Sequence, residues 1–469
     1  MIPPRLEPLL EAGAAPRELA RRFAAAGKVL YLVGGSVRDA LLNRSGGDTD
    51  LDFATDARPD EIRAIVGEWA HDLYLAGEAF GTIGAIRRGQ VHEITTFRRE
   101  VYRDDSRKPK VTFSDDIETD LSRRDFTVNA MAIRVPGGDE MPEMVDPYGG
   151  LADLASQTLR CPLDPHISFG DDPLRMLRLY RFVSQLGFVP DDAAVAAVAE
   201  MRDRLAVVSA ERIQGEFDKL MLGEHVGVAL WGLVRSGLAA EFIPELPALA
   251  VEQDPVHRHK DVLAHTIAVV EKTSSDLKVR LAALFHDIGK PATRRFESGG
   301  VSFHHHEVVG ARMTRERMRA LRYGKQVTND VSQLVFLHMR PHTYKMGWTD
   351  SAVRRYVRDA GNLLGPLNEL VRCDVTTRNA KRARSIERRI DELEARIVEL
   401  RKQEELDALR PPIDGNEVMQ YLELEPGPLI GEAMKLLYEH RIEHGPYSPE
   451  EAYALLDEWR AGGASVGDP

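Results

Sequence analysis

Residues 31–52, which read YLVGGSVRDALLNRSGGDTDLD, constrain the fold of this chain more than any other stretch. An apolar strand runs into Gly34 and Gly35, and a short helix, a glycine-rich turn and a second strand follow. Side chains two residues apart on a strand point the same way, so Asp50 and Asp52 are expected side by side on one face. Carboxylates that close repel each other unless a cation joins them, and oxygen ligands of this kind suit Mg²⁺. The pair therefore predicts a magnesium site.

The glycine pair upstream lets the backbone approach a ligand closely and leads into a helix N-terminus, a natural seat for phosphate. Arg38 projects from that helix as a candidate phosphate ligand. A diphosphate cradle beside a metal-binding carboxylate pair is the equipment of phosphoryl transfer. Taken singly, Gly-Gly is often only a turn and Asp-x-Asp only a solvated strand end. Their order and spacing together favour phosphoryl transfer.

Length and composition restrict the class of protein. The chain of 469 residues is too long for one core, and about three domains are expected. Apolar residues are 43% and charged residues 29% of the chain, as in ordinary soluble proteins, and no apolar run resembles a signal peptide or bilayer span. A cytoplasmic protein without a membrane partner is therefore expected. Cys161 and Cys373 are too few for a disulfide framework or a thiolate zinc site. At a net charge of −12, RNA binding requires a local basic patch.

Two segments extend the first domain. Residues 81–100 are typical of two strands joined by a tight turn at Gly89 and Gln90. Glu93 on the second of these strands is either a third carboxylate beside the aspartate pair or an ordinary strand residue. The span 99–122 is polar, charged and without regular pattern, which predicts a flexible loop over a substrate site.

The chain is expected to be helical from residue 146 onward, and FGDDPLRMLRLYRF is its most informative helical segment. Asp172, Arg175, Arg178 and Arg181 recur at three-residue steps, which predicts a charged stripe on one helix face. An Asp and an Arg one turn apart can present an acceptor and donors to a base edge. The alternative is an i,i+3 salt bridge on a solvated helix. A helix start is predicted at SAERIQGEFDKLM, with its serine as the N-cap.

A second group of polar residues lies beyond residue 250. Six candidate metal ligands, two of them adjacent, fall on five helical segments: His265, His286 with Asp287, His306, His338 and Asp374. Imidazole and carboxylate ligands on successive helices form divalent-metal sites in helical bundles. A single histidine on an apolar helix is usually a core residue, whereas this set predicts a second metal site.

The helix predicted at residues 378–402 has both an apolar seam and a basic start. The seam, for packing on a neighbouring helix, consists of Ile386, Ile390, Leu393, Ile397 and Leu400. The basic residues, which suit RNA phosphates, are Arg378, Lys381, Arg382, Arg384, Arg388 and Arg389. The alternative is the solvated face of a long helix.

The motifs together resemble the class II tRNA nucleotidyltransferases, or CCA-adding enzymes, whose superfamily includes bacterial poly(A) polymerases. The resemblance covers about the first half of the chain and is carried, in the family's order, by LVGGSVRDALL with DTDLD, EITTFR, RRDFTVNAMA, DPYGGLADL, DDPLRMLRLYRF and SAERI. The second half resembles the HD-domain extension of some bacterial members, with His286 and Asp287 as the HD pair. One departure is Asp171, where the family usually has Glu.

The resemblance implies an α+β fold: an N-terminal mixed-sheet nucleotidyltransferase palm, an all-α neck, an HD-type helical body and a helical tail. The implied domains are a catalytic head at 1–150, a neck with base recognition at 151–225, a metal-binding HD-type domain at 226–380 and a tRNA-contacting tail at 381–469.

The resemblance also implies roles for single residues. Asp50 and Asp52 would be catalytic and bind Mg²⁺, with Glu93 as a third carboxylate. Nucleotide contacts are implied for Gly34, Gly35, Arg38, Arg124, Asp125, Asn129, Asp172, Arg175, Arg178 and Arg181. Among these, Asp125 and Asn129 belong to the ribose-recognition motif, and Asp172 with Arg175 would pair with the base of CTP or ATP.

The expected activity is the addition of C, C and A to the 3′ end of tRNA from CTP and ATP, with Mg²⁺ as cofactor and a second divalent metal in the HD part as a further candidate. The rivals are a poly(A) polymerase, an enzyme that adds only CC or only A, and an HD phosphohydrolase. The span 99–122 favours the complete enzyme, because CC-adding relatives have a shortened loop. An RNA-binding protein without catalysis is disfavoured by the intact aspartate pair.

Overall fold

The computed structural model describes residues 2–11, 13–44, 51–101, 110–251, 261–297, 300–343, 347–375, 380–404 and 410–461. The chain forms two compact units, Met1–Pro247 and Ala248–Pro469. Within the described residues, none of the helices combines the length and the apolar character needed to cross a membrane. The finer division into four domains stays a prediction.

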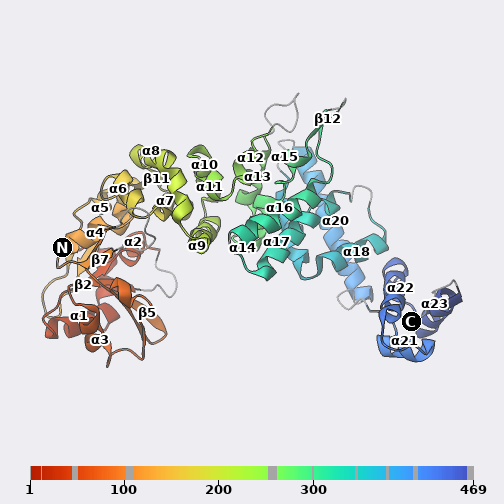
Figure 1. Ribbon diagram of the computed structural model, residues 1–469, viewed down its shortest axis with the longest axis horizontal. Helices are drawn as coiled ribbons and strands as arrows, with labels where there is room; N and C mark the ends of the chain where they lie inside the picture. Colours follow the sequence, from red (N-terminus) through yellow and green to blue (C-terminus); the bar gives the residue numbers. More distant parts are fainter. Residues whose placement is uncertain are drawn as a thin grey trace. The chain divides into compact units, whose positions relative to one another are not determined.

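The first unit begins with the 3₁₀ helix η1 (Pro4–Leu10) and helix α1 (Ala15–Ala25), and it is built on a seven-stranded sheet (Figure 1). The strands, in chain order, are β1 (Leu30–Val33), β2 (Leu51–Thr55), β3 (Asp72–Tyr74), β4 (Thr82–Arg87), β5 (Gln90–Thr96), β8 (Ala132–Arg134) and β9 (Glu143–Val145). In space the order is β3-β4-β5-β2-β1-β8-β9. Strands β2 and β5 are parallel and the other neighbours are antiparallel. The mixed sheet that the resemblance implies is thus confirmed.

The two faces of the sheet have different cover. On one face α1 and α3 (Pro59–Val66) pack against the strands, and Phe23, Ile62 and Phe53 share its apolar core. The other face holds a smaller cluster that includes Ala54 and residues of α4 (Ile117–Ser122). Asp52 lies two residues before Ala54 and therefore points to this second face. The smaller cover leaves room there for a site.

The predicted hairpin is present, but its turn lies one residue earlier than predicted. Arg87 pairs with Gln90, so the two turn residues are Arg88 and Gly89. Both have positive φ, 53° and 82°, as a two-residue turn of type I′ requires.

The prediction of an unpatterned loop over 99–122 is wrong for the described part of that span. Strands β6 (Arg98–Val101) and β7 (Lys110–Phe113) pair as an antiparallel ladder. Helix α4 follows, and the Asp116 side chain caps it by accepting from the N–H groups of Glu118 and Thr119. Residues 102–109 lie outside the described residues.

Helices complete the first unit. They are η2 (Glu78–Phe80), η3 (Thr127–Asn129), α2 (Gly35–Leu41), α5 (Gly150–Ser156), α6 (Pro165–Asp171), α7 (Leu174–Leu186), α8 (Asp192–Met201), η4 (Arg202–Val207), α9 (Ala210–Met221), α10 (Val226–Arg235), α11 (Ala239–Phe242) and α12 (Glu245–Ala248), with the short parallel pair β10 (Thr158–Leu159) and β11 (Val189–Pro190). As predicted, α9 starts at the N-cap Ser209, whose hydroxyl accepts from the Arg212 N–H. Helix α7 packs against both α9 and α10.

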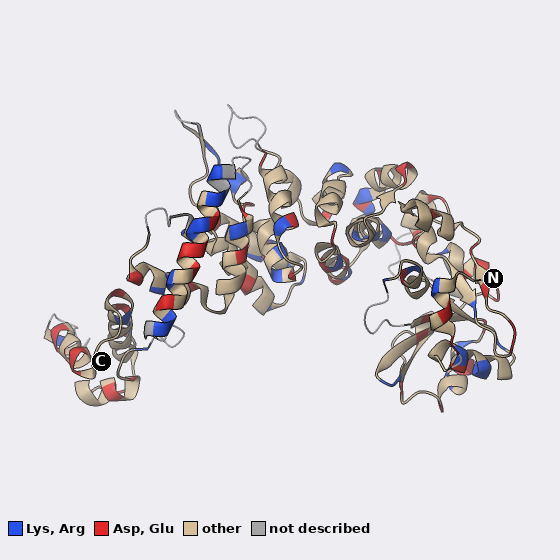
Figure 2. Cartoon of the chain, turned by 180° about the vertical axis from the view of Figure 1, so that it is seen from behind, with Lys and Arg blue, Asp and Glu red and all other residues tan. Residues whose placement is uncertain are grey.

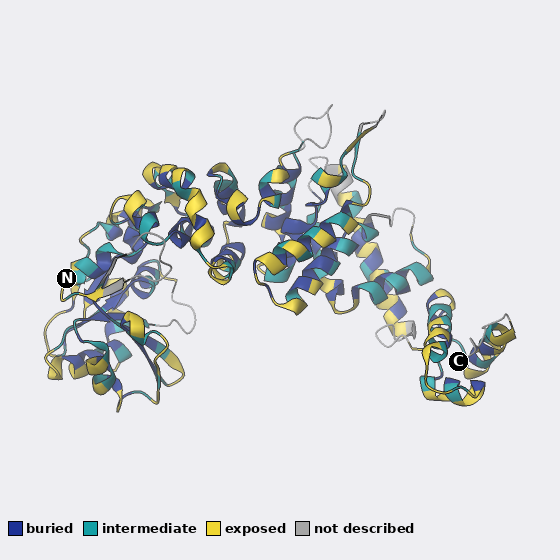
Figure 3. Ribbon diagram, in the orientation of Figure 1, coloured by how far each residue is buried: buried dark blue, intermediate teal, exposed yellow. Residues whose placement is uncertain are grey.

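In its described residues, the second unit is helical apart from one short hairpin, β12 (Arg295–Glu297) with β13 (Gly300–Ser302). Its helices are α13 (Val262–Lys272), α14 (Leu277–Phe285), α15 (Lys290–Thr293), α16 (His306–Ala320), α17 (Lys325–Leu337), η5 (Arg340–Thr343), α18 (Asp350–Ala360), η6 (Gly361–Leu363), α19 (Leu364–Cys373), α20 (Ala380–Glu404), α21 (Gly415–Leu422), α22 (Pro428–His444) and α23 (Pro449–Ala461). Buried and exposed residues alternate along these helices (Figure 3). Four of the five residues of the predicted seam on α20 are buried, and Ile386 is intermediate.

Candidate nucleotide pocket and metal cluster

Asp52 lies on β2, the central strand of the sheet, at the position predicted for the metal site. It pairs in register with Glu93 of the parallel strand β5, so both carboxylates lie on one face of the sheet. Gly34 has φ 74°, and the Cβ that it lacks would lie 2.8 Å from Nη1 of Arg124 and 3.7 Å from Oδ2 of Asp52. A larger residue would have to displace the Arg124 side chain and would contact Asp52. Asp50 lies outside the described residues, so the aspartate pair stays a prediction.

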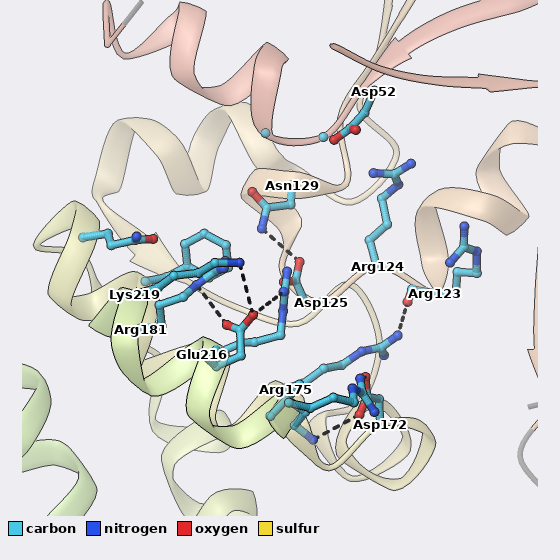
Figure 4. A pocket seen from close by; sticks show the side chains of 18 of the residues that line it. Asp52, Arg123, Arg124, Asp125, Asn129, Asp172, Arg175, Arg181, Glu216 and Lys219 are labelled. Carbon is cyan, nitrogen blue, oxygen red and sulfur yellow. Dashed lines mark hydrogen bonds and ion pairs between the residues drawn. The ribbon is translucent and has the colours of Figure 1, made fainter. Parts of the chain in front are cut away.

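Asp52 and the glycine pair open into a cavity of about 1170 Å³ within the first unit (Figure 4). Among the described residues that line it, nine are Lys or Arg and five are Asp or Glu. The charged residues are Arg38, Asp52, Arg98, Arg123, Arg124, Asp125, Asp172, Arg175, Arg178, Arg181, Glu211, Arg212, Glu216 and Lys219. This surplus of positive charge suits a polyanion. All ten predicted nucleotide-binding residues are in the lining, whereas Glu93 is not.

Asp125 organises one wall of the pocket. Its Oδ1 accepts from Nδ2 of Asn129 at 2.9 Å, and its Oδ2 accepts from Nε of Arg178 at 2.8 Å. The Oδ1 of Asn129 in turn accepts from Nη1 of Arg38. Burial by itself would raise the pKa of Asp125, but Arg178 and the Asn129 hydrogen bond hold that pKa well below its usual range. The chain thus fixes two arginines through one carboxylate.

Glu216 of α9 is the second anchor of this wall, and the sequence analysis did not find it. Its carboxylate lies 3.3 Å from Nη1 of Arg178 and 3.2 Å from Nε of Arg181 (Figure 4). Burial and the neighbouring Arg178 lower the pKa of Arg181 to about 10. An acid beside the apolar positions Ile213 and Phe217 of an amphipathic helix was the available signal.

The residues predicted to read the base are arranged differently from the predicted stripe. Asp172 is not on the helix with the arginines, because α6 ends at Asp171 and α7 starts at Leu174. The alternative reading, an i,i+3 salt bridge, does not describe Asp172 either, because its carboxylate forms an ion pair with Arg212 of α9, at 2.8 Å. Asp172 also accepts from the N–H of Leu174 at 3.1 Å.

Arg175 is buried, with 8% of its surface exposed. Its Nη1 donates to the carbonyl and hydroxyl oxygens of Ser168, and its Nη2 donates to the carbonyl of Arg123. The guanidinium plane is therefore held from two sides at the pocket wall. This fixed orientation is what a donor to a base edge needs.

Asp120 is a second residue that the sequence analysis missed. It is buried and accepts from Arg123 at 2.7 Å, and Arg124 lies 3.3 Å away. Burial favours its neutral form, but the two guanidinium groups lower its pKa. In Figure 4 the Arg124 side chain extends toward Asp52. Asp120 thus holds the Arg pair of the RRDF motif at the pocket.

The six predicted metal ligands of the second unit do come together. They form two groups of three, His265 with His286 and Asp374, and Asp287 with His306 and His338, and within each group the ligand atoms lie within 4.8 Å of one another. The Nε2 atoms of His265 and His286 are 3.2 Å apart, and those of His306 and His338 are 3.3 Å apart. Asp287 faces both groups, with Oδ2 3.2 Å from His286 and Oδ1 3.5 Å from His306.

The donor set fits divalent metal. The Nδ1 atoms of His286, His306 and His338 each lie within 2.9 Å of a backbone carbonyl. Such contacts fix the tautomer and leave Nε2 as the ligand atom. Burial opposes charge on His286, but Asp287 raises the pKa of His286 to about 10, whereas burial and His286 lower the pKa of His338 to about 3. A cation between the rings would satisfy all the facing acceptors.

The predicted basic patch at the start of α20 is only partly visible. Arg378 and the side chain of Arg382 lie outside what the structure describes, while Lys381 and Arg384 are exposed. Lys and Arg alternate with Asp and Glu along the helix (Figure 2). Ion pairing accordingly occupies part of the patch, as between Arg388 and Glu392 at 3.6 Å.

Three protein-family models match the chain in succession. The "Poly A polymerase head domain" covers residues 30–160, the "Probable RNA and SrmB- binding site of polymerase A" covers 187–249, and the "HD domain" covers 262–400. A curated relative, the A-adding tRNA nucleotidyltransferase of Deinococcus radiodurans, is 30% identical over 91% of this chain and 95% of its own length. The chain belongs to the CCA-adding family of tRNA nucleotidyltransferases.

Other family members match over a shorter span at higher identity. The CCA-adding enzyme of Anoxybacillus flavithermus is 42% identical over 47% of this chain and 53% of its own length. The chain therefore spans about half the length of the first curated relatives that it matches.

Solved structures of the family share the fold. The Bacillus stearothermophilus CCA-adding enzyme in complex with CTP matches 98% of this chain and 99% of its own at a TM-score of 0.70 and 23% identity. The Thermotoga maritima CCA-adding enzyme complexed with tRNA matches 98% of this chain and 96% of its own, at a TM-score of 0.58 and 16% identity. At these identities the likeness concerns the fold alone.

Proposed function

We propose that this chain adds CCA to the 3′ end of tRNA without a template, from CTP and ATP, and releases diphosphate at each step. One observation carries the proposal: a single cavity contains Asp52, the Gly34-Gly35 backbone, Arg38 and the Asp172 and Arg175 pair. The terminal 3′-hydroxyl of tRNA attacks the α-phosphorus of the nucleotide. The new O3′–P bond forms as the bond between the α-phosphorus and the bridging oxygen breaks, and diphosphate leaves.

The side chains of this chain supply binding and orientation. Arg38, held by Asn129 and Asp39, and Arg124 would hold the triphosphate. Gly34 lets the substrate approach the backbone where a Cβ would meet Arg124 and Asp52. Charge-assisted contacts of this kind to phosphate are strong and directional. The surplus of cations around the cavity favours the bound polyanion and its leaving diphosphate.

Asp52 fits a Mg²⁺ ligand, because its carboxylate stands next to the close approach at Gly34 and in register with Glu93. Asp52, with Asp50 and with Glu93 as a third carboxylate, would hold the ion. Bound Mg²⁺ would supply Lewis-acid chemistry, acidifying the attacking hydroxyl and neutralising the diphosphate.

Base choice is assigned to Asp172 and Arg175. A carboxylate accepts from the exocyclic amine of C or A, and a guanidinium donates to a ring acceptor. UTP and GTP present the opposite pattern and would leave both partners unpaired, which favours the correct bases by roughly 10⁴-fold at such sites. Because Asp172 is paired with Arg212, the carboxylate would exchange that partner for the base.

Incubation with tRNA tests the proposal directly. A tRNA that ends at the discriminator base is given CTP, ATP or both, and the 3′ ends are sequenced. The expected ends are CC with CTP alone and CCA with both nucleotides. Unextended tRNA under all conditions would contradict the proposal.

The same incubations, repeated with tRNA that already ends in CC, separate the partial reactions. The Deinococcus relative, which matches over nearly its whole length, is an A-adding tRNA nucleotidyltransferase. If this chain shares that restriction, tRNA ending in CC gains A while tRNA ending at the discriminator base stays unextended. A poly(A) polymerase would instead add a run of A.

Phosphohydrolysis by the metal cluster is a second candidate function, for nucleotides or cyclic phosphates. The six ligand residues of the HD part and their buried, oriented Nε2 atoms support it. The full chain is tested with divalent metals on 2′,3′-cyclic and monoester phosphates. Release that Asp287→Asn abolishes and Asp52→Asn leaves unchanged would support this function.

A further inference from the structure

Phe182 lies among three of the arginines that line the nucleotide pocket. The guanidinium carbon of Arg181 is 3.9 Å from the ring centroid, that of Arg38 is 5.1 Å away, and that of Arg178 is 5.6 Å away. All three distances are within the range in which an aromatic ring attracts a cation. Phe182 itself lines the cavity and is 3% exposed.

These three arginines come from two separate elements. Arg38 is on α2, after the glycine pair, whereas Arg178 and Arg181 are on α7, next to the base-reading residues. Phe182 also packs edge-on against Phe126 of the RRDF motif, with centroids 5.7 Å apart at 85°. One ring therefore contacts three motifs that the proposed reaction uses.

Like charges held this close repel one another. Burial and the neighbouring Arg178 lower the pKa of Arg181 to about 10, and Arg38 acts in the same direction. Carboxylates neutralise part of this charge: Asp125 pairs with Arg178, Glu216 pairs with both Arg178 and Arg181, and Asp39 pairs with Arg38. The negative face of an aromatic ring offsets repulsion without adding an anion that would compete with phosphate.

We propose that Phe182 is a positioning residue of the nucleotide pocket: its ring keeps the guanidinium groups of Arg38, Arg178 and Arg181 close together and available to the polyphosphate of the incoming nucleotide. This inference rests on the proposed function and deepens it. A carboxylate in its place would add a further anion to the cluster, and an aliphatic side chain would remove the ring's share of the compensation. The ring does neither, so the positive charge is kept for the ligand.

The test compares Phe182→Leu with Phe182→Tyr, which keeps the ring, and with Phe23→Leu. Phe23 is a matched control, because it is fully buried in the core on the opposite face of the sheet. Dissociation constants of CTP, ATP and inorganic tripolyphosphate are measured on the full chain by calorimetry, together with melting temperatures. Tripolyphosphate has no base or ribose, so it reports on the charge cluster alone.

The expected result is a roughly tenfold weaker binding of all three ligands in Phe182→Leu, from the loss of the cation–π contacts. Phe182→Tyr should stay within about twofold of wild type. Phe23→Leu should lower the melting temperature without weakening the binding of tripolyphosphate. If the tyrosine hydroxyl does not fit and Phe182→Tyr loses stability, the comparison of the two leucine variants decides.

Equal tripolyphosphate affinities in Phe182→Leu and Phe23→Leu would overturn the inference, as would a loss in Phe182→Leu confined to one base. Both results leave the proposed function intact when wild type still extends tRNA. A wild-type chain that binds neither CTP nor ATP overturns the proposed function and this inference with it.

Discussion

The nucleotide pocket of the first unit has a surplus of cationic side chains, whereas the metal cluster of the second unit has a surplus of acceptor atoms. The pocket gathers nine cationic side chains against five acidic ones among its described lining residues. The metal cluster brings together imidazole nitrogens and carboxylates whose acceptor atoms face one another at 2.9 to 3.5 Å. Buried charge without a partner is costly. The surplus at each site therefore indicates the kind of ligand that it suits. The pocket suits a polyanion, and the cluster suits a cation.

Asp52 is one of five acidic residues that line the cationic pocket, and its replacement should have the largest effect. Asp52→Asn keeps the shape of the side chain but removes the charge that would hold Mg²⁺. We expect nucleotide incorporation into tRNA to fall by at least about 10³-fold, as loss of several kcal/mol of charge stabilisation implies. Single-turnover incorporation of labelled CTP and ATP measures this.

Asp60→Asn is the matched control, since that carboxylate is on α3, on the opposite face of the sheet, and its side chain is 93% exposed. It should leave incorporation unchanged. Incorporation by Asp52→Asn within tenfold of wild type would remove Asp52 from the catalytic assignment.

Asp287 faces both ligand groups of the metal cluster. Its replacement therefore tests whether metal binding by the cluster is independent of nucleotide incorporation at the pocket. Asp287→Asn should weaken divalent-metal binding to the full chain by about 100-fold or more, because a charged ligand is lost. Metal content after dialysis, by elemental analysis, measures this. Incorporation of CTP and ATP should be unchanged.

Asp391→Asn on α20, with a side chain 63% exposed, is the control and should bind as much metal as wild type. If Asp287→Asn retained its metal, the cluster would be a buried hydrogen-bonded network instead of a site. If it lost incorporation as well, the two regions would not act separately.

The two regions also differ in how far the sequence foretold them. The metal cluster could be predicted because its ligands are chemically distinctive, and six such residues on five successive helical segments rarely occur by chance. The structure brings all six together. The pocket could be predicted only at its motifs. Its buried anchor Glu216 was missed because it pairs with arginines of another helix through tertiary packing, which spacing along the chain does not show. Asp120 was missed although its partners Arg123 and Arg124 follow it by three and four residues.

The misplaced stripe shows a limit of another kind. Three-residue spacing predicted one helix from Asp172 to Arg181, but Pro173 follows Asp172. A residue before proline is pushed out of the helical region, and Asp172 has φ −141° and ψ 101°. Pro173 therefore indicated that the helix could not include Asp172, but the prediction gave more weight to the three-residue spacing. The fold class, by contrast, followed from the resemblance and is confirmed by the sheet.

Asp125 and Arg178 form a buried ion pair of the pocket. Asp125→Asn should therefore lower the free energy of unfolding more than the control substitutions Asp60→Asn and Asp391→Asn do. Leaving Arg178 with only Glu216 should cost about 2 kcal/mol of unfolding free energy. The folded-state pKa of Asp125 is lowered, so its contribution is present above the unfolded value of about 4 and is lost as pH falls below it.

Urea unfolding of wild type and Asp125→Asn from pH 7 to pH 3 measures this difference. It should be constant above about pH 5 and shrink below about pH 4. A difference that instead grew toward low pH would mean that Asp125 is not the charged partner of Arg178.

Asp172 and Arg212 form the exposed counterpart of that pair, and they should show the smallest effect. The Arg212 side chain is 54% exposed and lies 2.8 Å from Asp172, so Arg212→Gln should cost about 0.5 kcal/mol or less at low salt. That loss should vanish in about 1 M salt, where exposed charges are screened, whereas the loss in Asp125→Asn should persist. Urea unfolding of both variants at two salt concentrations measures the contrast. A loss in Arg212→Gln as large and as salt-resistant as that in Asp125→Asn would show that Asp172 is locked in place, and a locked carboxylate could not exchange Arg212 for a base.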